Sequence, residues 1–380
     1  MNWFNTRPTR EPLDVRHDRS LGFTWCRLPD CQCVQGGPEA CSTLLLGATG
    51  YLTHLPKLIA LQSLVVFLCL SSSIFAQQQK VIVVVGAQGT DEYGKQFEAW
   101  ADNWQSAIES SDQSKPTFVR IGSTDSDKTD AELLKAEIAS TPENLNELWI
   151  VLIGHGTDDR KSSKFNLRGP DVSAAELNQW LTPLSCRVIV INCTSASGKF
   201  INQIVHPNRI VATATKSGAQ HNFARFGGYL SRAIDDPAYD LDKDQQTSLL
   251  EAFIAASSQT QEFYLQETRL ATELAMIDDN GDGLGTPADW FQGTRVVRKS
   301  KQGEPDGFVA NQVFLIRRGT EAQLSEDQRK NRDALERKLE QLRLQKSTMT
   351  EEAYYQAIEP ILLELSKLYQ AIDYSKGQQE

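Results

Sequence analysis

The sequence predicts an α/β fold, in which a mostly parallel sheet has helices on both faces in three layers, followed by a C-terminal α-helical hairpin. Short apolar runs such as KVIVVV at 80–85 and LWIVLI at 148–153 alternate with segments of helical periodicity. Runs of this kind are typical of parallel strands buried on both faces. Their alternation with helices indicates βαβ units. After residue 325 the pattern is helical only.

The strands are expected where apolar runs end in glycine or in small polar residues. They are predicted at 80–85, 116–121, 148–153, 187–191 and 209–214, with a further strand at 309–316. Parallel strands in an open sheet direct their carboxyl ends to one edge, which is where such folds place their active clefts. Gly86, His155, Cys193 and Ser217 all follow predicted strands.

The helices are expected where apolar residues recur every three or four positions. Within 93–108 these are Phe97, Trp100, Trp104 and Ile108. Other helices are predicted at 130–138, 173–181, 222–234, 248–256 and 261–277. The helix at 173–181 begins at a capping box, in which a serine is followed three positions later by a glutamate.

The tail is predicted to form two helical arms within 325–372. Ser325 and Gln328 match a capping box, and Leu335 begins a narrow apolar stripe on the first arm. Thr350 starts the second arm. This hairpin, assigned to 321–380, is either a packed appendage or a surface for self-association or for another partner.

Composition and charge exclude several classes of protein. The 380 residues are 40% hydrophobic and 23% charged, which excludes a disordered chain and a multi-span membrane protein. The net charge of −10 argues against nucleic acid as a partner, because a nucleic-acid binder needs a basic surface.

The N-terminal region is predicted to be removed from the mature protein. The apolar run at 58–70 has thirteen residues and no charge, whereas a membrane span needs about 20. With Lys57 before it and Ala76 after it, the run is typical of a signal peptide at 53–76, so the protein is expected to be secreted or periplasmic. An uncleaved anchor or a buried helix is the alternative. Residues 1–52 are interpreted as a doubtful upstream extension, with translation starting close to Leu52.

The cysteines of the predicted mature chain are Cys186 and Cys193, one on each side of a predicted strand. An extended strand of this length separates their Cα atoms by roughly 23 Å, but a disulfide requires less than about 7 Å. Both thiols are therefore expected to be free. A free cysteine in an exported protein suggests a catalytic role.

His155 and Cys193 form the candidate catalytic pair. Each follows an apolar strand, and one crossover connects the two strands, so the strands are expected to be neighbours or one strand apart. Cys193 can supply a thiolate, and His155 can act as general acid and then as base. The backbone N–H groups of Gly156 and Cys193 are the candidate oxyanion donors. The alternative is a structural histidine and a buried cysteine acting as a small apolar residue.

These motifs resemble the caspase/legumain/gingipain clan of cysteine peptidases, and the legumain (C13) family in particular. The resemblance rests on VLIGHGTDD at 151–159, VIVINCTSASGKF at 188–200, RIVATATKSG at 209–218 and the first strand and helix at 80–104. It covers about 80–234 and implies a caspase-like fold and cysteine endopeptidase activity on a polypeptide substrate, with no required cofactor.

Two departures from the family concern its asparagine-selective pocket. Legumain-type enzymes have Glu-Ala-Cys-Glu-Ser-Gly at the nucleophile, whereas this chain has Asn192-Cys193-Thr194 there. The family's Arg-His pair falls at Gly94-Lys95. The resemblance therefore implies the catalytic pair but not asparaginyl specificity. The remaining candidates for substrate binding are Lys95, Asp158 and Ser217.

An acidic loop after the predicted helix at 261–277 resembles the first half of an EF-hand calcium loop. Its candidate ligands at alternate positions are Asp278, Asn280, Asp282 and, through its carbonyl, Leu284, with Asp289 in place of the usual last glutamate. Oxygen ligands around a glycine turn suit a structural calcium ion. The alternative is a polar turn that caps the preceding helix.

The sequence thus predicts an exported cysteine endopeptidase with its peptidase domain at 77–320. The alternative is a catalytically inactive peptidase-like protein that binds or scaffolds partners. A nucleotide-binding protein is disfavoured, because the loop Gly86-Ala87-Gln88-Gly89 lacks a phosphate-binding motif.

Overall fold

A computed structural model describes residues 79–111, 115–123, 126–159, 161–298, 302–319 and 321–376. The upstream extension predicted at 1–52 and the signal peptide predicted at 53–76 lie outside the described residues. Within the described residues, no helix is both long and apolar enough to cross a membrane. The domain boundaries and the export of the chain stay predictions.

The central sheet has seven strands in the order β10-β9-β8-β7-β3-β1-β2. The strands β1, β2, β3, β7 and β8 are parallel to one another. The strand β9 pairs antiparallel with β8, and β10 pairs antiparallel with β9. Their bounds are β1 Gln79–Val85, β2 Thr117–Ile121, β3 Glu147–Ile153, β7 Arg187–Asn192, β8 Arg209–Thr213, β9 Met276–Asp278 and β10 Thr286–Pro287.

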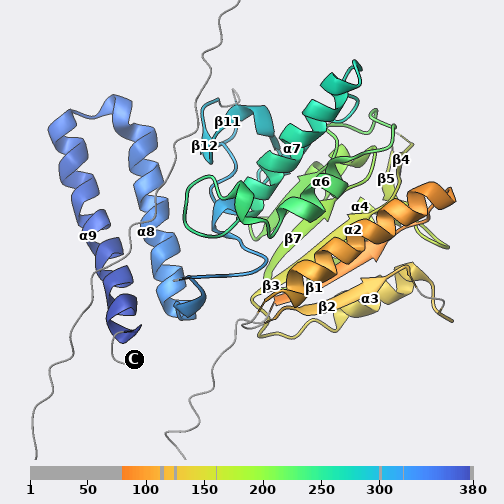
Figure 1. Ribbon diagram of the computed structural model, residues 1–380, viewed down its shortest axis with the longest axis horizontal. Helices are drawn as coiled ribbons and strands as arrows, with labels where there is room; N and C mark the ends of the chain where they lie inside the picture. The colour runs from red at the N-terminus through yellow and green to blue at the C-terminus, as the bar shows by residue number, and fades with distance from the viewer. Residues whose placement is uncertain are drawn as a thin grey trace, which may run out of the picture. The chain divides into compact units, whose positions relative to one another are not determined.

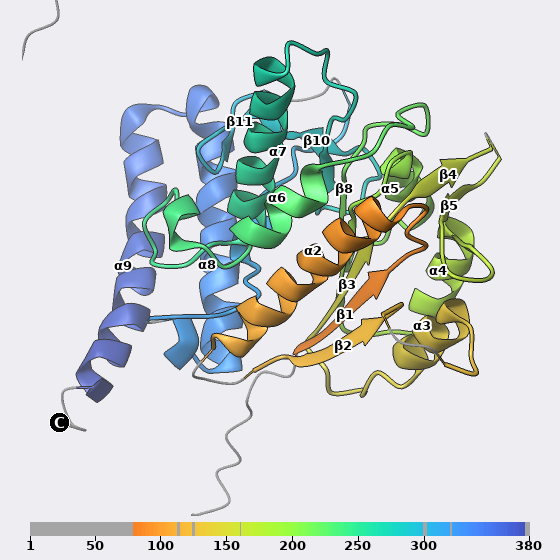
Figure 2. The same ribbon diagram turned by 45° about the vertical axis from the view of Figure 1, so that its right-hand side comes forward.

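Helices cover both faces of this sheet, as Figures 1 and 2 show. One apolar core lies under α2, α6 and α7, and a second lies under α3, α4 and α5. The bounds are α2 Asp91–Glu109, α3 Asp130–Ala139, α4 Ala174–Leu181, α5 Phe200–Gln203, α6 Phe226–Ala233 and α7 Leu249–Gln266. Alternation along the strands divides the side chains between the two cores, since Val83 and Val151 face the first and Val84 and Leu152 face the second.

The predicted fold class is confirmed. The apolar runs at 80–85 and 148–153 are fully buried strands, as expected for strands covered on both faces. The capping box at Ser173 is present, with Glu176 accepting the Ser173 N–H at 2.9 Å. Two small sheets lie outside the central one, formed by β4 Gly156–Asp158, β5 Ser163–Phe165 and β6 Val172–Ser173, and by β11 Phe291–Gln292 and β12 Arg295–Val296.

Two predicted elements are wrong. The helix expected at 261–277 ends at Gln266, and the residues that follow lead into β9, which lies between β8 and β10 in the sheet. Leu270, in the middle of the predicted helix, is 90% exposed. The strand expected at 309–316 is a single 3₁₀ turn at Ala310–Gln312 followed by an irregular segment. Its apolar residues are buried against α7 instead of pairing in a sheet.

The C-terminal hairpin consists of α8 Glu326–Gln345 and α9 Glu351–Lys376, which lie side by side in both views (Figures 1 and 2). The predicted capping box at Ser325 and Gln328 is present. Leu335 and Leu339 are the buried apolar positions of α8. The hairpin contacts the preceding chain through Glu336, which accepts a hydrogen bond from Gln312 at 2.6 Å.

Candidate functional site

The carboxyl ends of β3 and β7 form the region where the predicted catalytic residues lie. The two strands are parallel neighbours, with Leu152 paired to Asn192. His155 follows β3, and Cys193 follows β7. The expectation that these two strand ends lie close together is therefore confirmed, because parallel neighbours end at the same edge of the sheet.

The imidazole of His155 lies in a partly exposed aromatic pocket. Its ring meets Tyr93 and Phe97 edge to face, with centroid distances of 5.1 and 5.2 Å. Phe223 forms a further wall at 6.3 Å. The Nε2 atom of His155 lies 3.3 Å from the carbonyl oxygen of Gln88, in the loop between β1 and α2. The packing and this hydrogen bond hold the ring toward α2.

Cys193 lies in the first apolar core and is completely buried. Its side chain packs beneath α6, where a Cβ added at Gly227 would lie 2.5 Å from the Cys193 Cβ and 3.0 Å from its Sγ. Burial raises the pKa of the Cys193 thiol to about 12. Among the described residues, no hydrogen bond joins this thiol to His155. The thiolate needed for nucleophilic attack is therefore strongly disfavoured in this arrangement.

The two predicted oxyanion donors are both engaged. The Cys193 N–H donates to the Leu152 carbonyl at 2.9 Å and continues the β3–β7 ladder. The Gly156 N–H makes a long contact of 3.4 Å with the Ser195 Oγ. Of these two donors, the Gly156 N–H is therefore the more weakly engaged.

Ser195 is a site residue that the sequence analysis missed. Its hydroxyl donates to the Gly156 carbonyl at 3.3 Å, so it lies against the backbone of the His-Gly motif. The next residue, Ala196, has φ of 53°, a left-handed conformation that is uncommon outside glycine. A signal for Ser195 is present in the sequence. If the legumain-type run is matched to the chain at Ser197-Gly198, Ser195 takes the place of the nucleophile.

The predicted substrate-binding residues are only partly brought together. The Asp158 carboxylate pairs with Lys199 at 2.8 Å and lies against Gly218, where an added Cβ would come within 1.4 Å of its Oδ2. Ser217 is half-buried in the same loop as Gly218. Lys95 is exposed on α2. Asp158 and Ser217 therefore share one side of the site.

Of the described residues, the other cysteine is free and the other two histidines lie at the surface. Cys186 and Cys193 are both free and buried, so the expectation that they do not bridge is confirmed. His206 and His221 are exposed. The Nδ1 atom of His206 accepts the Asn208 N–H at 3.1 Å, which is a local turn contact.

The acidic loop at 278–289 is closed by its own hydrogen bonds. Asp278 is buried and accepts the N–H groups of Gly281 and Gly283 at 2.9 and 2.8 Å. Asn280 accepts the Asp282 N–H, and Asp282 accepts the Leu284 N–H, at 2.9 and 2.7 Å.

The predicted last ligand of this loop, Asp289, is engaged elsewhere. It pairs with Arg298 at 3.1 Å and lines a pocket under α7. Asp306, which lies outside the predicted set, binds the loop instead and accepts the Asp279 N–H at 3.0 Å. Calcium binding by this loop stays a prediction.

A second acidic loop was overlooked. Asp240, Asp242 and Asp244 place carboxylate oxygens within 4.8 Å of one another. Of the residues that the structure describes, these three form the one group of three or more histidine, cysteine or acidic side chains close enough to share a metal ion. Their alternate spacing was the signal in the sequence.

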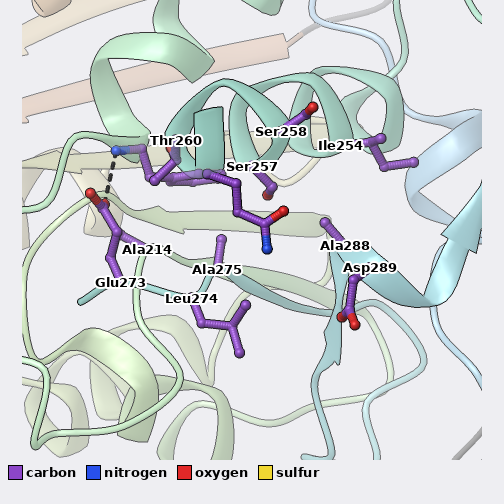
Figure 3. Close-up of a pocket in the computed structure, with 12 residues that line it drawn as sticks. Ala214, Ile254, Ser257, Ser258, Thr260, Glu273, Leu274, Ala275, Ala288 and Asp289 are labelled. Carbon is purple, nitrogen blue, oxygen red and sulfur yellow. Dashed lines mark hydrogen bonds between the residues drawn. The ribbon is translucent and has the colours of Figure 1, made fainter. Parts of the chain in front are cut away.

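A pocket of about 210 Å³ lies between α7 and the segment that leads into β9, as Figure 3 shows. Ile254 and Ser257 from α7 line one side, and Leu274 and Ala275 line the other. At one end Glu273 accepts the Phe226 N–H at 3.1 Å and so caps α6. This pocket contains neither His155 nor Cys193.

Comparisons with known proteins give only distant similarities. No family model matches the chain, and no curated protein matches it. The chain is similar to the initiator caspase Dronc from Drosophila, with a TM-score of 0.37 and 12% identity, over 55% of this chain and 82% of that one. It is also similar to Raptor from Chaetomium thermophilum, with a TM-score of 0.30 and 12% identity, over 42% of this chain and 18% of that one. The resemblance to the legumain family stays a prediction.

Proposed function

We propose that this chain is a peptidase-like protein that lacks cysteine-dependent catalysis and acts by binding a partner. The observation that carries this proposal is the position of Cys193, whose thiol is fully buried and whose pKa is raised to about 12. A nucleophilic cysteine needs access to substrate and a stabilised thiolate. Cys193 has neither, and it packs as a small apolar residue.

The position of His155 supports the same proposal. A catalytic base must lie within hydrogen-bonding reach of the proton that it abstracts. The Nε2 atom of His155 faces the Gln88 carbonyl at 3.3 Å, and Tyr93 and Phe97 pack around the ring. Among the described residues, neither Cys193 nor Ser195 makes a hydrogen bond to the imidazole in this orientation.

The hairpin is the part of the chain that we propose meets the partner. Its exposed large apolar side chains are Leu344 and Tyr355, exposed by 54% and 55%, and Leu362 and Leu363, exposed by 47% and 54%. Adjacent apolar residues on a solvent-facing helix are typical of an interaction surface. The partner that we propose to test is a second copy of this chain. Sedimentation velocity of the parent protein and of a Leu362→Glu/Leu363→Glu variant should show an oligomer that the variant loses.

A second candidate is a serine-dependent hydrolase. It is favoured by the contacts of Ser195, whose Oγ lies 3.4 Å from the Gly156 N–H and 3.3 Å from its carbonyl. In such a reaction the Ser195 Oγ would attack a carbonyl carbon while His155 takes the hydroxyl proton. The Gly156 N–H would then stabilise the oxyanion, and His155 would return the proton to the leaving group as its bond to the carbonyl carbon breaks. Water, deprotonated by His155, would then attack the acyl-serine and release the acid and the Ser195 hydroxyl. Ser195 is 4% exposed, which favours the binding role.

Labelling with two probe classes separates these functions. A thiol-directed acyloxymethyl ketone and a hydroxyl-directed fluorophosphonate would be applied to the native protein and to Cys193→Ala, Ser195→Ala and His155→Ala variants. Cys186→Ser is the matched control for a buried thiol outside the site. Hydrolysis of a diverse peptide library would be measured in parallel.

The binding proposal predicts no label that depends on any of these residues, and no hydrolysis. A thiol label lost in both Cys193→Ala and His155→Ala, accompanied by hydrolysis, would establish the cysteine endopeptidase instead. A fluorophosphonate label lost in Ser195→Ala and His155→Ala would establish the serine hydrolase.

A further inference from the structure

The segment from Asp240 to Glu251 has the ligand spacing of a complete EF-hand calcium loop. Acidic side chains stand at positions 1, 3, 5 and 12 of the twelve residues, at Asp240, Asp242, Asp244 and Glu251. The carbonyl of Gln246 stands at position 7. Position 6, which is glycine in the usual loop, is Gln245, and its φ of 75° is the left-handed conformation that this turn requires. Helix α7 begins within the loop, at Leu249.

The loop is already folded around its acidic groups. The Asp240 carboxylate accepts the N–H groups of Lys243, Asp244 and Gln245 at 2.6, 3.2 and 3.0 Å. Glu251 is fully buried and turns back toward the loop, where its Oε1 accepts the Leu241 N–H at 2.7 Å, while its Oε2 caps α7 by accepting the Ser248 N–H at 2.7 Å. The carboxylates of positions 1, 3 and 5 have oxygens within 4.8 Å of one another.

A cavity of about 300 Å³ beside the loop provides an independent reason to expect a cation. It is lined by the carboxylates of Asp242, Asp244, Glu321 and Glu336, and by one cationic side chain, Arg332. Glu321 is only 5% exposed, and its Oε2 has no hydrogen-bond partner among the described residues. Burying a carboxylate oxygen without a hydrogen-bond donor costs free energy. The four carboxylates also carry more negative charge than the one guanidinium can neutralise.

The negative charges of the loop also favour a bound cation. The carboxylate of Asp244 lies within 4.8 Å of the carboxylates of Asp240 and Asp242. The acidic side chains that face it are Asp240, Asp242 and Glu251. A divalent cation would relieve the repulsion among these groups.

We propose that residues 240–251 bind a calcium ion through Asp240, Asp242, Asp244, Glu251 and the carbonyl of Gln246. Calcium is favoured over magnesium because it accepts six to eight oxygen ligands in a flexible arrangement, whereas magnesium demands a near-ideal octahedron. The site lies at the start of α7 and borders the cavity that Glu321 and the hairpin line. Calcium therefore tightens the contact between this loop and the hairpin. The proposal is independent of whether the chain hydrolyses peptides.

The experiment compares the two acidic loops of the full chain after treatment with a chelator. Calcium chloride would be titrated calorimetrically into the parent protein, into an Asp242→Asn/Asp244→Asn variant and into an Asp282→Asn variant. Asp242 and Asp244 are exposed, so their substitution should leave the fold intact, in contrast to the buried Glu251. Asp282→Asn is the matched control, since it changes one ligand position in the other loop.

We expect a binding event in the parent protein whose affinity falls by at least about tenfold in the Asp242→Asn/Asp244→Asn variant. The same event should persist in Asp282→Asn. Calcium should also raise the melting temperature of the parent protein, and this shift should be lost in the double variant. No calcium-dependent heat, or equal affinities in the parent and the double variant, would overturn the proposal.

Discussion

At the scale of single residues, the contact between Cys193 and Gly227 decides what the candidate site can do. The helix α6 lies so close to the sheet that the thiol fits only because residue 227 lacks a side chain. Trp100 also packs against this glycine, since its Cε3 would lie 3.2 Å from a Cβ added at Gly227. The thiol is thus a packing group with a reactive atom that the fold keeps from solvent.

Gly227→Ala tests this packing. The added methyl group would overlap the Cys193 Cβ and Trp100, so we expect the free energy of unfolding to fall by about 1–3 kcal/mol. Gly94→Ala is the matched control on α2, because an added Cβ there meets mainly the flexible side chain of Gln88. Urea denaturation measures both variants. Equal stability of Gly227→Ala and the parent protein would show that α6 is not held against Cys193.

The sequence predicts which strands His155 and Cys193 follow, but it does not predict that the Cys193 thiol is buried. The apolar runs before His155 and Cys193 place both at one sheet edge, because strand direction follows from the βαβ pattern. Burial of the thiol depends on α6, whose closeness to the sheet comes from Gly227 and has no local signature. Ser195 could not be predicted for the same reason, because its contact with Gly156 joins the ends of two different strands.

At the scale of elements, α6 depends on a capping residue that lies far away in the sequence. Glu273 is 3% exposed and accepts the N–H groups of both Arg225 and Phe226, at the start of the helix. A carboxylate there satisfies N–H groups that the helix cannot pair itself. Burial nevertheless raises the pKa of Glu273 above its ordinary value of 4.5.

This shift predicts a pH dependence of stability. A carboxyl whose pKa is higher in the folded protein than in the unfolded chain stabilises the fold fully below its unfolded pKa. That contribution is lost as the pH rises through the folded pKa. The free energy of unfolding, measured by urea denaturation between about pH 5 and about pH 8, should therefore decrease more in the parent protein than in Glu273→Gln. An identical decrease in both proteins would assign the dependence to other groups.

The elements that were predicted wrongly share one cause. The helix expected at 261–277 continued a spacing of apolar residues past Gln266, but Ala275 is buried just before β9, and Ile277 is buried within β9, which pairs with β8 and β10. Residues 309–316 contain buried apolar side chains and yet form no strand. In both segments the apolar pattern correctly indicates burial. The choice between helix, strand and irregular chain depends on partners distant in the sequence.

At the scale of the whole molecule, the two helices of the hairpin are joined to the segment just before α8 by a buried ionic cluster. Arg332 is 3% exposed and pairs with Glu321, and Tyr369 of α9 also donates to Glu321, at 3.1 Å. Buried ion pairs add little net stability, but removal of one member leaves the other uncompensated.

Arg332→Ala should therefore destabilise the packing of α8 and α9 around Glu321 by about 3–5 kcal/mol. Limited proteolysis would detect earlier cleavage near residue 320, and urea denaturation would measure the loss of stability. An Arg332→Met/Glu321→Leu variant is the control, because apolar side chains of similar size should restore most of the stability. Unchanged proteolysis of Arg332→Ala would mean that this cluster does not hold the hairpin.

The hydrogen bonds of Gln79 have a consequence for how the chain folds. This first described residue of β1 donates to Glu147 and to the Phe314 carbonyl, 235 positions away, at 2.6 and 3.0 Å. The sheet order likewise places β1 between two strands that are made after it. Contacts of such separation form slowly, because long loops must close first. During synthesis β1 can pair with β2 and β3 early, but the Gln79 side chain lacks its second acceptor until the segment around Phe314 has left the ribosome.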